Sequence, residues 1–256
     1  MKKVAIIGSG NVAEALVCAV AASPYELVQV AARNSDRGRT LARMGGCDYT
    51  DKVASPARAD IYLIAVSDSA ISEIATTTDF GDGVVAHTAG SVDIDALGPC
   101  IKHRAVLYPL QSFTAGRKVD FSRIPLFIEA STPVALEAIN ALAQTLSGSV
   151  RYTSSELRAQ VHLAAVFACN FTNFMYIAGE KILKESDMEF DLLKPLIEEC
   201  ASKAVASTSP ALTQTGPAVR GDIVTQKRHL EMLHDGQLKT IYRIISKNIW
   251  KTLRKQ

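Results

Sequence analysis

A glycine-rich turn near the start of the chain has the residues needed to bind nucleotide phosphates. Residues 3–13 read Lys-Val-Ala-Ile-Ile-Gly-Ser-Gly-Asn-Val-Ala, a G-x-G-x-x-A pattern that follows an apolar run. In such a pattern Gly8 permits a tight turn, Gly10 lets a pyrophosphate approach the backbone, and Ala13 allows close packing. The following helix offers free N–H groups and the positive end of its dipole. We expect five residues to contact a dinucleotide: Gly8, Ser9, Gly10, Asn11 and Val12.

The end of the second predicted strand indicates which dinucleotide binds. NAD enzymes usually place Asp or Glu there to bond the ribose 2′-hydroxyl. Here Arg33 takes that place, Arg37 follows one turn later, and Asp36 comes three residues too late to replace the missing acid. Two arginines attract a 2′-phosphate, and each charge-assisted hydrogen bond contributes roughly 1.5–3 kcal/mol. The sequence therefore predicts NADP, bound here by Arg33, Asn34, Ser35 and Arg37.

Two further segments follow predicted strands and are expected on the nicotinamide side. Val66, Ser67 and Asp68 come after one apolar run, and Ala89 and Gly90 after the next. The carboxyl ends of parallel strands line the crevice where cofactors lie. Asp68 also suits the cap of the helix that follows it, so both roles stay open for this residue.

Polar residues inside an apolar helical pattern in the second half are candidates for catalysis. Hydride transfer to a carbonyl leaves an alkoxide that needs a donor and then a proton. His162 is the predicted general acid, because imidazoles exchange protons near neutral pH, and Asn170 is predicted to orient the carbonyl. The alternative is that both side chains only satisfy hydrogen bonds in a core.

A second candidate corner lies around Gly216-Pro217, which is typical of a helix start. Arg220 in the first turn of such a helix would receive a substrate carboxylate. Asp222 and His229 are predicted to fix that corner. An ordinary capped helix with surface charges explains the same residues.

These residues need a framework, and the first half of the chain predicts an α/β one. Apolar runs at 3–7, 27–31, 61–66, 84–87, 105–108 and 125–129 read as strands, and segments 11–22, 35–44, 68–76 and 133–146 read as helices. Such alternation predicts a doubly wound, mostly parallel Rossmann sheet. We predict an NADP-binding Rossmann domain over residues 1–152 and an all-α substrate and dimerisation domain over 153–256.

One predicted helix, over residues 154–184, is apolar on nearly all of its circumference, which is typical of a buried helix. We expect it at the centre of the second domain. Ala164, Ala168 and Ala178 allow close helix approach, so we also predict a homodimer through the helical domain.

Composition excludes several other classes of protein. The net charge of +2 gives no reason to expect nucleic acid or membrane as a partner. No stretch is expected to reach the ~18 apolar residues of a membrane span, and the apolar N-terminus is explained by the nucleotide turn rather than by a signal peptide. The five cysteines form no C-x-x-C pair, which indicates no metal site and a reducing, cytoplasmic location.

The N-terminal half resembles the NADP-binding domains of pyrroline-5-carboxylate reductase and of the hydroxyacid and 6-phosphogluconate dehydrogenases. Nearly the whole chain resembles Rossmann-like oxidoreductases that end in a domain of unknown function. The motifs that carry this resemblance are residues 65–71, 87–91, 108–113 and 215–222, together with His162, Asn170-Phe171 and His229-Leu230. Tyr108 departs from the pattern, which has His before Pro-Leu.

The resemblance implies a reductase, since some relatives are thought to reduce ketopantoate. We predict hydride transfer from NADPH to a small 2-oxo acid, with ketopantoate as the first choice of this small anionic substrate. Imine reduction is the alternative among enzymes, although the second half lacks the small-residue-rich pattern expected for it. A non-catalytic NADP-sensing protein is the alternative outside enzymes.

Overall fold

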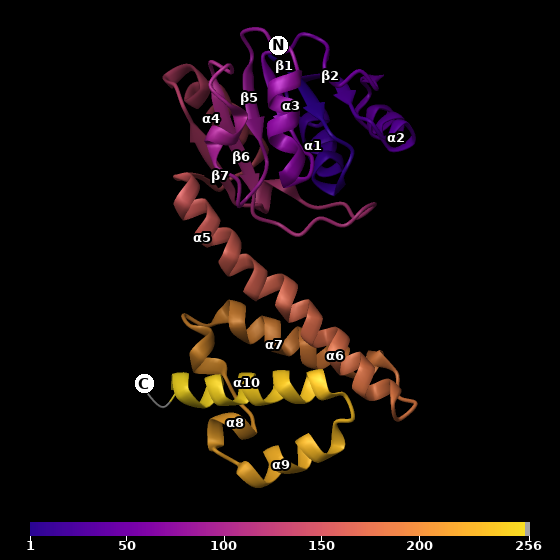
Figure 1. Ribbon diagram of the computed structural model, residues 1–256, viewed down its shortest axis with the longest axis vertical. Coiled ribbons are helices and arrows are strands. Elements are labelled where there is room, and N and C mark those ends of the chain that lie inside the picture. Colours follow the sequence, from indigo (N-terminus) through magenta and orange to yellow (C-terminus); the bar gives the residue numbers. More distant parts are fainter. Residues whose placement is uncertain (254–256) are drawn as a thin grey trace. The chain divides into compact units, whose positions relative to one another are not determined.

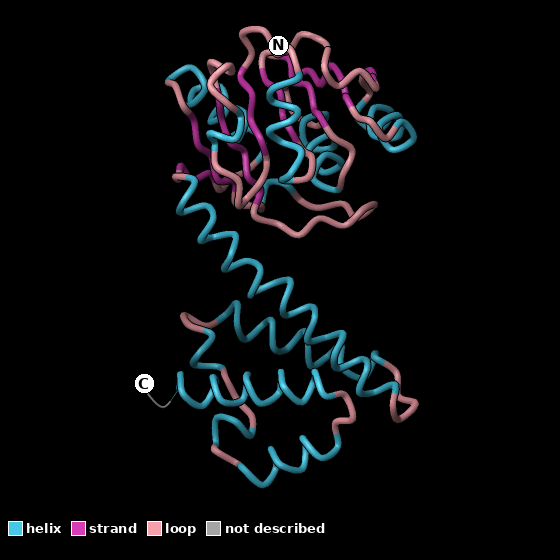
Figure 2. The backbone as a smooth tube through the Cα atoms, in the orientation of Figure 1, coloured by secondary structure: helices cyan, strands magenta, loops and turns pink. Residues whose placement is uncertain are grey.

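The computed structural model describes residues 1–253 and consists of two compact units, Met1–Cys169 and Asn170–Gln256 (Figure 1). The last three residues of the predicted helical domain thus lie outside the described part. Strands occur in the first unit, and the described residues of the second unit form helices and loops (Figure 2).

The first unit is built on one eight-stranded sheet, as the alternating pattern predicts. Its strands are β1 (Lys3–Ile7), β2 (Glu26–Ala31), β3 (Asp48–Thr50), β4 (Ile61–Ile64), β5 (Val84–His87), β6 (Arg104–Pro109), β7 (Leu126–Ala130) and β8 (Val150–Tyr152). They lie in the order β3-β2-β1-β4-β5-β6-β7-β8, and only the β6–β7 pair is antiparallel. The order reverses at β1, which is where doubly wound sheets bind their ligands.

Helices cover both faces of this sheet. They are α1 (Asn11–Ala21), α2 (Ser35–Gly45), α3 (Ile71–Thr77) and α4 (Pro133–Leu146), whereas α5 (Ser155–Ala165) is tied to the sheet at its start and leads away from it. Along β1, Val4 and Ile6 pack in the cluster that contains α1, α2 and α4, whereas Ala5 and Ile7 face the cluster that contains α3. Burial on both faces explains why the central strands read as continuous apolar runs.

Local signals define the ends of several elements. Thr132 caps α4 by accepting a hydrogen bond from the backbone N–H of Ala135 at 3.2 Å, and Pro133 takes the first helical position. The predicted helix 68–76 instead opens with a 3-10 turn at Asp68–Ala70. The two short strands β3 and β8 were not predicted, because three residues carry too little pattern.

The second unit holds α6 (Thr172–Lys184), α7 (Lys194–Ala206), α8 (Pro217–Arg220), α9 (Ile223–Met232) and α10 (Gly236–Leu253). Lys181 binds Asp235 at 2.5 Å and so ties α6 to the start of α10. His229 and the Tyr242 hydroxyl, 2.9 Å apart, join α9 to α10.

The long helix predicted over 154–184 is interrupted and exposed, which corrects the expectation of a buried central helix. A π-helical segment, Val166–Phe171, separates α5 from α6. Large apolar side chains on both helices are exposed, among them Leu163 at 58% and Ile177 at 52%. An apolar pattern predicts that a surface is covered, but it does not say by what.

By length and composition alone, residues 155–184 could also cross a membrane, which corrects the expectation that no segment is apolar enough. Core helices of soluble proteins can be equally long and apolar.

Candidate active site

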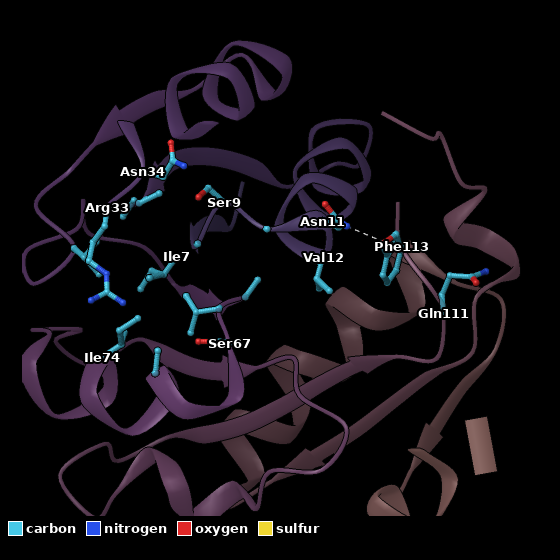
Figure 3. A pocket seen from close by; sticks show the side chains of 18 residues that line it. Ile7, Ser9, Asn11, Val12, Arg33, Asn34, Ser67, Ile74, Gln111 and Phe113 are labelled. Atoms are coloured by element: carbon cyan, nitrogen blue, oxygen red, sulfur yellow. Dashed lines mark hydrogen bonds between the residues drawn. The ribbon is translucent and has the colours of Figure 1, made fainter. Parts of the chain in front are cut away.

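A cavity of about 580 Å³ opens at the carboxyl ends of β1, β2 and β4 (Figure 3). Gly8 forms its floor with φ of +129°, and a Cβ there would lie 2.1 Å from the carbonyl oxygen of Ala65. Only glycine allows β1 to turn so close to the end of β4. A Cβ at Gly10 would meet no atom within 4 Å, because this residue faces the open cavity.

The start of α1 points its unbonded N–H groups at this cavity. Gly10 is the N-cap and has no side chain to satisfy them, so these N–H groups remain for a ligand. An anion is the ligand that such a helix start prefers. The residues present therefore fit the pyrophosphate of a dinucleotide.

Most of the predicted cofactor residues line this cavity. Those that do are Gly8, Ser9, Gly10, Asn11, Val12, Arg33, Asn34, Val66 and Ser67. Five others do not line it, namely Ser35, Arg37, Asp68, Ala89 and Gly90.

The two arginines proposed for the 2′-phosphate differ in the structure. Arg33 lines the cavity, is 68% exposed, and has a loose ion pair with Glu73 at 3.8 Å. Arg37 instead turns back under the turn, where its guanidinium pairs with Glu14 and its Nε donates to the Ser9 carbonyl at 3.3 Å. Arg33 is thus the arginine available to a ligand, and Arg37 braces the phosphate turn.

Sequence reasoning missed one wall of the cavity. Gln111 and Phe113, from the loop after β6, line the cavity on the side opposite Arg33 and Asn34 at the end of β2 (Figure 3). The Asn11 amide holds this loop by donating to the Phe113 carbonyl at 3.0 Å. Glu14 adds a second tie, since its carboxylate accepts from the Gly116 N–H at 2.9 Å. The loop follows a predicted central strand, and this position in the sequence could have predicted that it lies near the cofactor.

A second group of polar residues lies beyond the cavity, at the carboxyl ends of β5 and β6. The Ser91 hydroxyl donates to the Asp68 carboxylate at 2.8 Å, so Asp68 binds the loop after β5 instead of capping the next helix with its side chain. Beside this loop the Tyr108 hydroxyl and Nδ1 of His162 lie 3.1 Å apart. The first unit therefore contains the predicted acid His162 and a tyrosine partner that was not predicted.

Gly90 is what lets these two rings meet. A Cβ at Gly90 would lie 2.6 Å from Nδ1 of His162 and 2.8 Å from Cζ of Tyr108. Any larger residue would have to displace one of them.

The base of α5 is fixed to the sheet, and this fixes His162. Arg158 is completely buried, pairs with Glu129 on β7 and donates to the Val92 carbonyl. Ser155 donates to Glu129 at 2.8 Å and accepts from the Ile94 N–H at 3.1 Å. A buried ion pair with such partners holds one geometry well, because breaking it strands a charge.

Behind this site lies a buried histidine. His87 ends β5 with no exposed surface, and its Nδ1 accepts from the Ala89 N–H at 3.2 Å. Burial, helped by the charge of Arg158, lowers the pKa of His87 to about 4. The ring is therefore neutral at neutral pH.

The other predicted catalytic residues belong to the second unit. Asn170 lies in the π-helical segment and is exposed, as is Arg220 at the end of α8. The predicted single helix after Gly216 is two helices, since α8 has four residues and Asp222 caps α9 by accepting from the Thr225 N–H at 2.9 Å. These backbone and hydroxyl hydrogen bonds from Thr225 lower the pKa of Asp222. Asp222 thus caps α9, whereas His229 contacts Tyr242 on α10, and no long helix start supports Arg220.

No group of three or more His, Cys, Asp or Glu side chains that could hold a metal ion occurs within residues 1–253. The dinucleotide is the cofactor that the described residues fit.

Family models match two segments of the chain. Residues 3–90 match the model described as NADP oxidoreductase, coenzyme F420-dependent, and residues 124–249 match a domain of unknown function. No curated protein matches the chain significantly.

Solved structures similar to the chain include an NADP oxidoreductase of inferred function from Bacteroides fragilis. It is 37% identical, 98% of each chain is covered, and the TM-score is 0.91. A 1-pyrroline-5-carboxylate reductase from Streptococcus pyogenes is 13% identical over 100% of this chain and 99% of its own, with a TM-score of 0.61. An imine reductase from Myxococcus stipitatus bound to NADP+ is 16% identical over 99% and 93%, with a TM-score of 0.62. These two share the fold.

Proposed function

Because this chain belongs to the family of Rossmann-type NADP oxidoreductases that end in a domain of unknown function, we propose that it reduces a small 2-oxo acid with NADPH. Ketopantoate is the substrate we test first. The observation that carries the proposal is the position of His162. Contacts within the first unit hold this acid beside Gly90 at the carboxyl edge of the sheet that forms the dinucleotide cavity.

The cavity residues have a binding role in this proposal. The start of α1 receives the pyrophosphate, and Arg33 with Asn34 receives the adenosine 2′-phosphate. Val66 and Ser67 lie on the way to the nicotinamide end, where Asp68, Ala89 and Gly90 follow at the ends of neighbouring strands. Ser35 and Arg37 support the 2′-phosphate site, since Asn34 caps α2 by accepting from the Arg37 N–H at 3.1 Å.

When bound, NADPH supplies a hydride to the carbonyl carbon. His162 then donates a hydrogen bond to the developing alkoxide and gives it a proton. We keep Asn170 as the residue that orients the carbonyl and Arg220 as the one that binds the carboxylate, with Asp222 and His229 in support. A substrate with both a carbonyl and a carboxylate, as in a 2-oxo acid, would contact His162 and Asn170 through the first group and Arg220 through the second.

NADPH oxidation followed at 340 nm tests this function. The panel contains ketopantoate, other small 2-oxo acids and 1-pyrroline-5-carboxylate as a cyclic imine. We expect turnover of a 2-oxo acid, a loss of about 10²–10⁴ in kcat for His162→Gln, and a raised KM for Arg220→Ala. Asn170→Ala is expected to lower kcat.

The other outcomes identify the alternatives. Turnover of the imine alone would make the protein an imine reductase, to which the similar folds of such enzymes lend support. Tight NADPH binding without turnover of any compound would indicate a sensing protein. If Asn170→Ala and Arg220→Ala both keep wild-type kinetics, the substrate is not bound by these residues.

We also propose that the exposed apolar face of α5 and α6 is covered by a second copy of the chain. Ser155 and Arg158 are bound to the sheet, and Lys181 pairs with Asp235, so neither end of residues 155–184 is free to enter a bilayer. A homodimer buries this face without such a conflict.

A cytoplasmic location agrees with this proposal. All five cysteines are free in the structure, as expected for a reducing compartment. Fractionation of the native cells would test it, and recovery of the protein with membranes would contradict both this location and the homodimer.

A further inference from the structure

We propose that Tyr108 and His162 form a proton-supplying pair. In this pair the Tyr108 hydroxyl donates to Nδ1 of His162, keeps the ring proton on Nε2, and replaces that proton after the substrate has taken it. The inference rests on the proposed function, because it assumes a carbonyl that is reduced beside His162. Tyr108 is a positioning residue here, since it acts through His162.

The geometry brings the two rings into a defined contact. The hydroxyl oxygen and Nδ1 are 3.1 Å apart, and the ring centroids are 5.9 Å apart in an edge arrangement. Tyr108 is set by β6, where it pairs with Phe127 on β7. His162 is set by the buried base of α5. Neither ring depends on the second unit for its position.

The direction of the hydrogen bond follows from the surroundings of the hydroxyl. Tyr108 is 8% exposed and packs against Val106, Phe127 and Val161, and no other hydrogen-bond partner of its hydroxyl occurs among residues 1–253. If Nδ1 carried the proton, the tyrosine proton would point at no acceptor. An unsatisfied buried donor would disfavour that arrangement roughly 5- to 150-fold. The tyrosine therefore donates, and Nε2 carries the ring proton.

Burial of Tyr108 keeps the phenol protonated. Burial raises the pKa of Tyr108, and Asp68 adds to this effect, while Arg158 opposes it. Arg158 is itself neutralised by Glu129, and His87 below the site is uncharged at neutral pH. The hydroxyl is thus available as a proton source through the neutral range.

The proton transfers balance without a charged imidazole. The alkoxide oxygen takes the proton of Nε2, and Nδ1 takes the proton of the tyrosine hydroxyl. The Nε2–H and tyrosine O–H bonds break, while the alcohol O–H and Nδ1–H bonds form. The negative charge moves from the alkoxide to the phenolate, a far weaker base, and water later returns a proton to it. Imidazoles ordinarily lose their charge above about pH 7, so the pair extends proton supply to higher pH.

The tautomer can be measured without substrate or cofactor. We would record ¹⁵N resonances of the histidine rings in the full-length protein at pH 7.5 and assign His162 by the signal lost in His162→Gln. The Nε2–H form is expected to predominate. In Tyr108→Phe the ratio of Nε2–H to Nδ1–H should fall at least about fivefold.

Two further variants test whether the tautomer ratio reports the contact between Tyr108 and His162. Gly90→Ala pushes the rings apart and should shift the ratio in the same direction as Tyr108→Phe. Tyr62→Phe removes another buried hydroxyl, which accepts from the Ala59 N–H at 2.9 Å, and should leave His162 unchanged. A predominant Nδ1–H form in the wild type, or an unchanged ratio in Tyr108→Phe, would overturn the proposal.

The pH profile tests the second half of the proposal, with ketopantoate as substrate. Wild-type kcat should stay level from about pH 7 to 9, whereas kcat of Tyr108→Phe should fall nearly tenfold per unit because only charged imidazole can still donate. The KM for NADPH should not change. Parallel profiles of the two proteins would overturn the relay. If no 2-oxo acid is turned over, the proposed function fails on its own, while the tautomer still decides whether the pair exists.

Discussion

Replacing Arg33 or its partner Glu73 should change the preference for NADPH in opposite directions. Arg33 lines the cavity with 68% of its side chain exposed, and Glu73 is 63% exposed at 3.8 Å from it. A bound 2′-phosphate would compete with Glu73 for the guanidinium. Arg33→Ala removes the attraction to the phosphate, whereas Glu73→Gln removes the competitor.

The size of both effects follows from the exposure of the pair. A charge-assisted hydrogen bond contributes roughly 1.5–3 kcal/mol, and a solvent-exposed ion pair contributes about 0–1 kcal/mol that the ligand must replace. The net effect of Arg33 is then about 0.5–3 kcal/mol, so Arg33→Ala should raise the Kd of NADPH roughly 2- to 150-fold. Glu73→Gln should lower it by up to about fivefold. The Kd of NADH should change by less than about twofold in both variants.

Calorimetric titration of both dinucleotides at fixed ionic strength measures these values. Arg39→Ala is the matched control, because Arg39 lies on α2, which begins just after Arg33, but stacks over the ring of Tyr49 with its Cζ at 4.8 Å from the centroid. Arg37→Ala should weaken NADPH and NADH alike, since it removes a brace of the turn. If Arg33→Ala changes both dinucleotides equally or neither, Arg33 does not bind the 2′-phosphate.

Three other perturbations test the framework of the site. The pKa of His87 is lowered to about 4 in the folded chain and is about 6.5 when unfolded, so its contribution to stability is present above pH 6.5 and is lost as the pH falls toward 4. Urea unfolding should therefore show that the wild type loses about 2 kcal/mol more than His87→Asn between pH 7.5 and pH 5, and equal losses would refute a neutral buried ring. Gly8→Ala places a Cβ 2.1 Å from the Ala65 carbonyl oxygen, so binding of NADPH and NADH should weaken more than about tenfold, and unchanged titrations would show that the turn does not need glycine. Ile177→Glu, on the exposed apolar face, should convert a dimer to a monomer in light scattering while NADPH binding stays intact, and a monomeric wild type would contradict the homodimer.

The pattern of the sequence was enough for the parts of the fold that depend on local rules. The run Val84–His87 is a strand with the predicted ends, because a central parallel strand is apolar on both faces. The helix Pro133–Leu146 also begins and ends as predicted, with Thr132 and Pro133 as its start signal. The edge strands β3 and β8 escaped prediction because pairing with a neighbour, rather than their own residues, makes them strands.

The candidate site also has parts that local sequence predicts and parts that depend on distant residues. The phosphate turn was predictable because its glycine pattern and the strand and helix signals around it lie within residues 3–13. The difference between Arg33 and Arg37 was not, since it depends on Glu14, which is 23 residues away from Arg37. The contact of Tyr108 with His162 spans 54 residues and depends on how α5 lies on the sheet. The departure from His before Pro-Leu at Tyr108 was the one signal in the sequence that this position differed.

The π-helical segment Val166–Phe171 has a consequence for protein engineering. It marks the change between the two compact units, and it follows His162, so His162 and its partner Tyr108 lie in the dinucleotide-binding half of the chain. A full-length hybrid joined within this segment to the C-terminal half of a relative would inherit NADPH affinity and the pH profile from one parent. If the proposed function holds, its choice of substrate should come from the other parent, whereas a joint before α5 would separate His162 from the sheet that holds it.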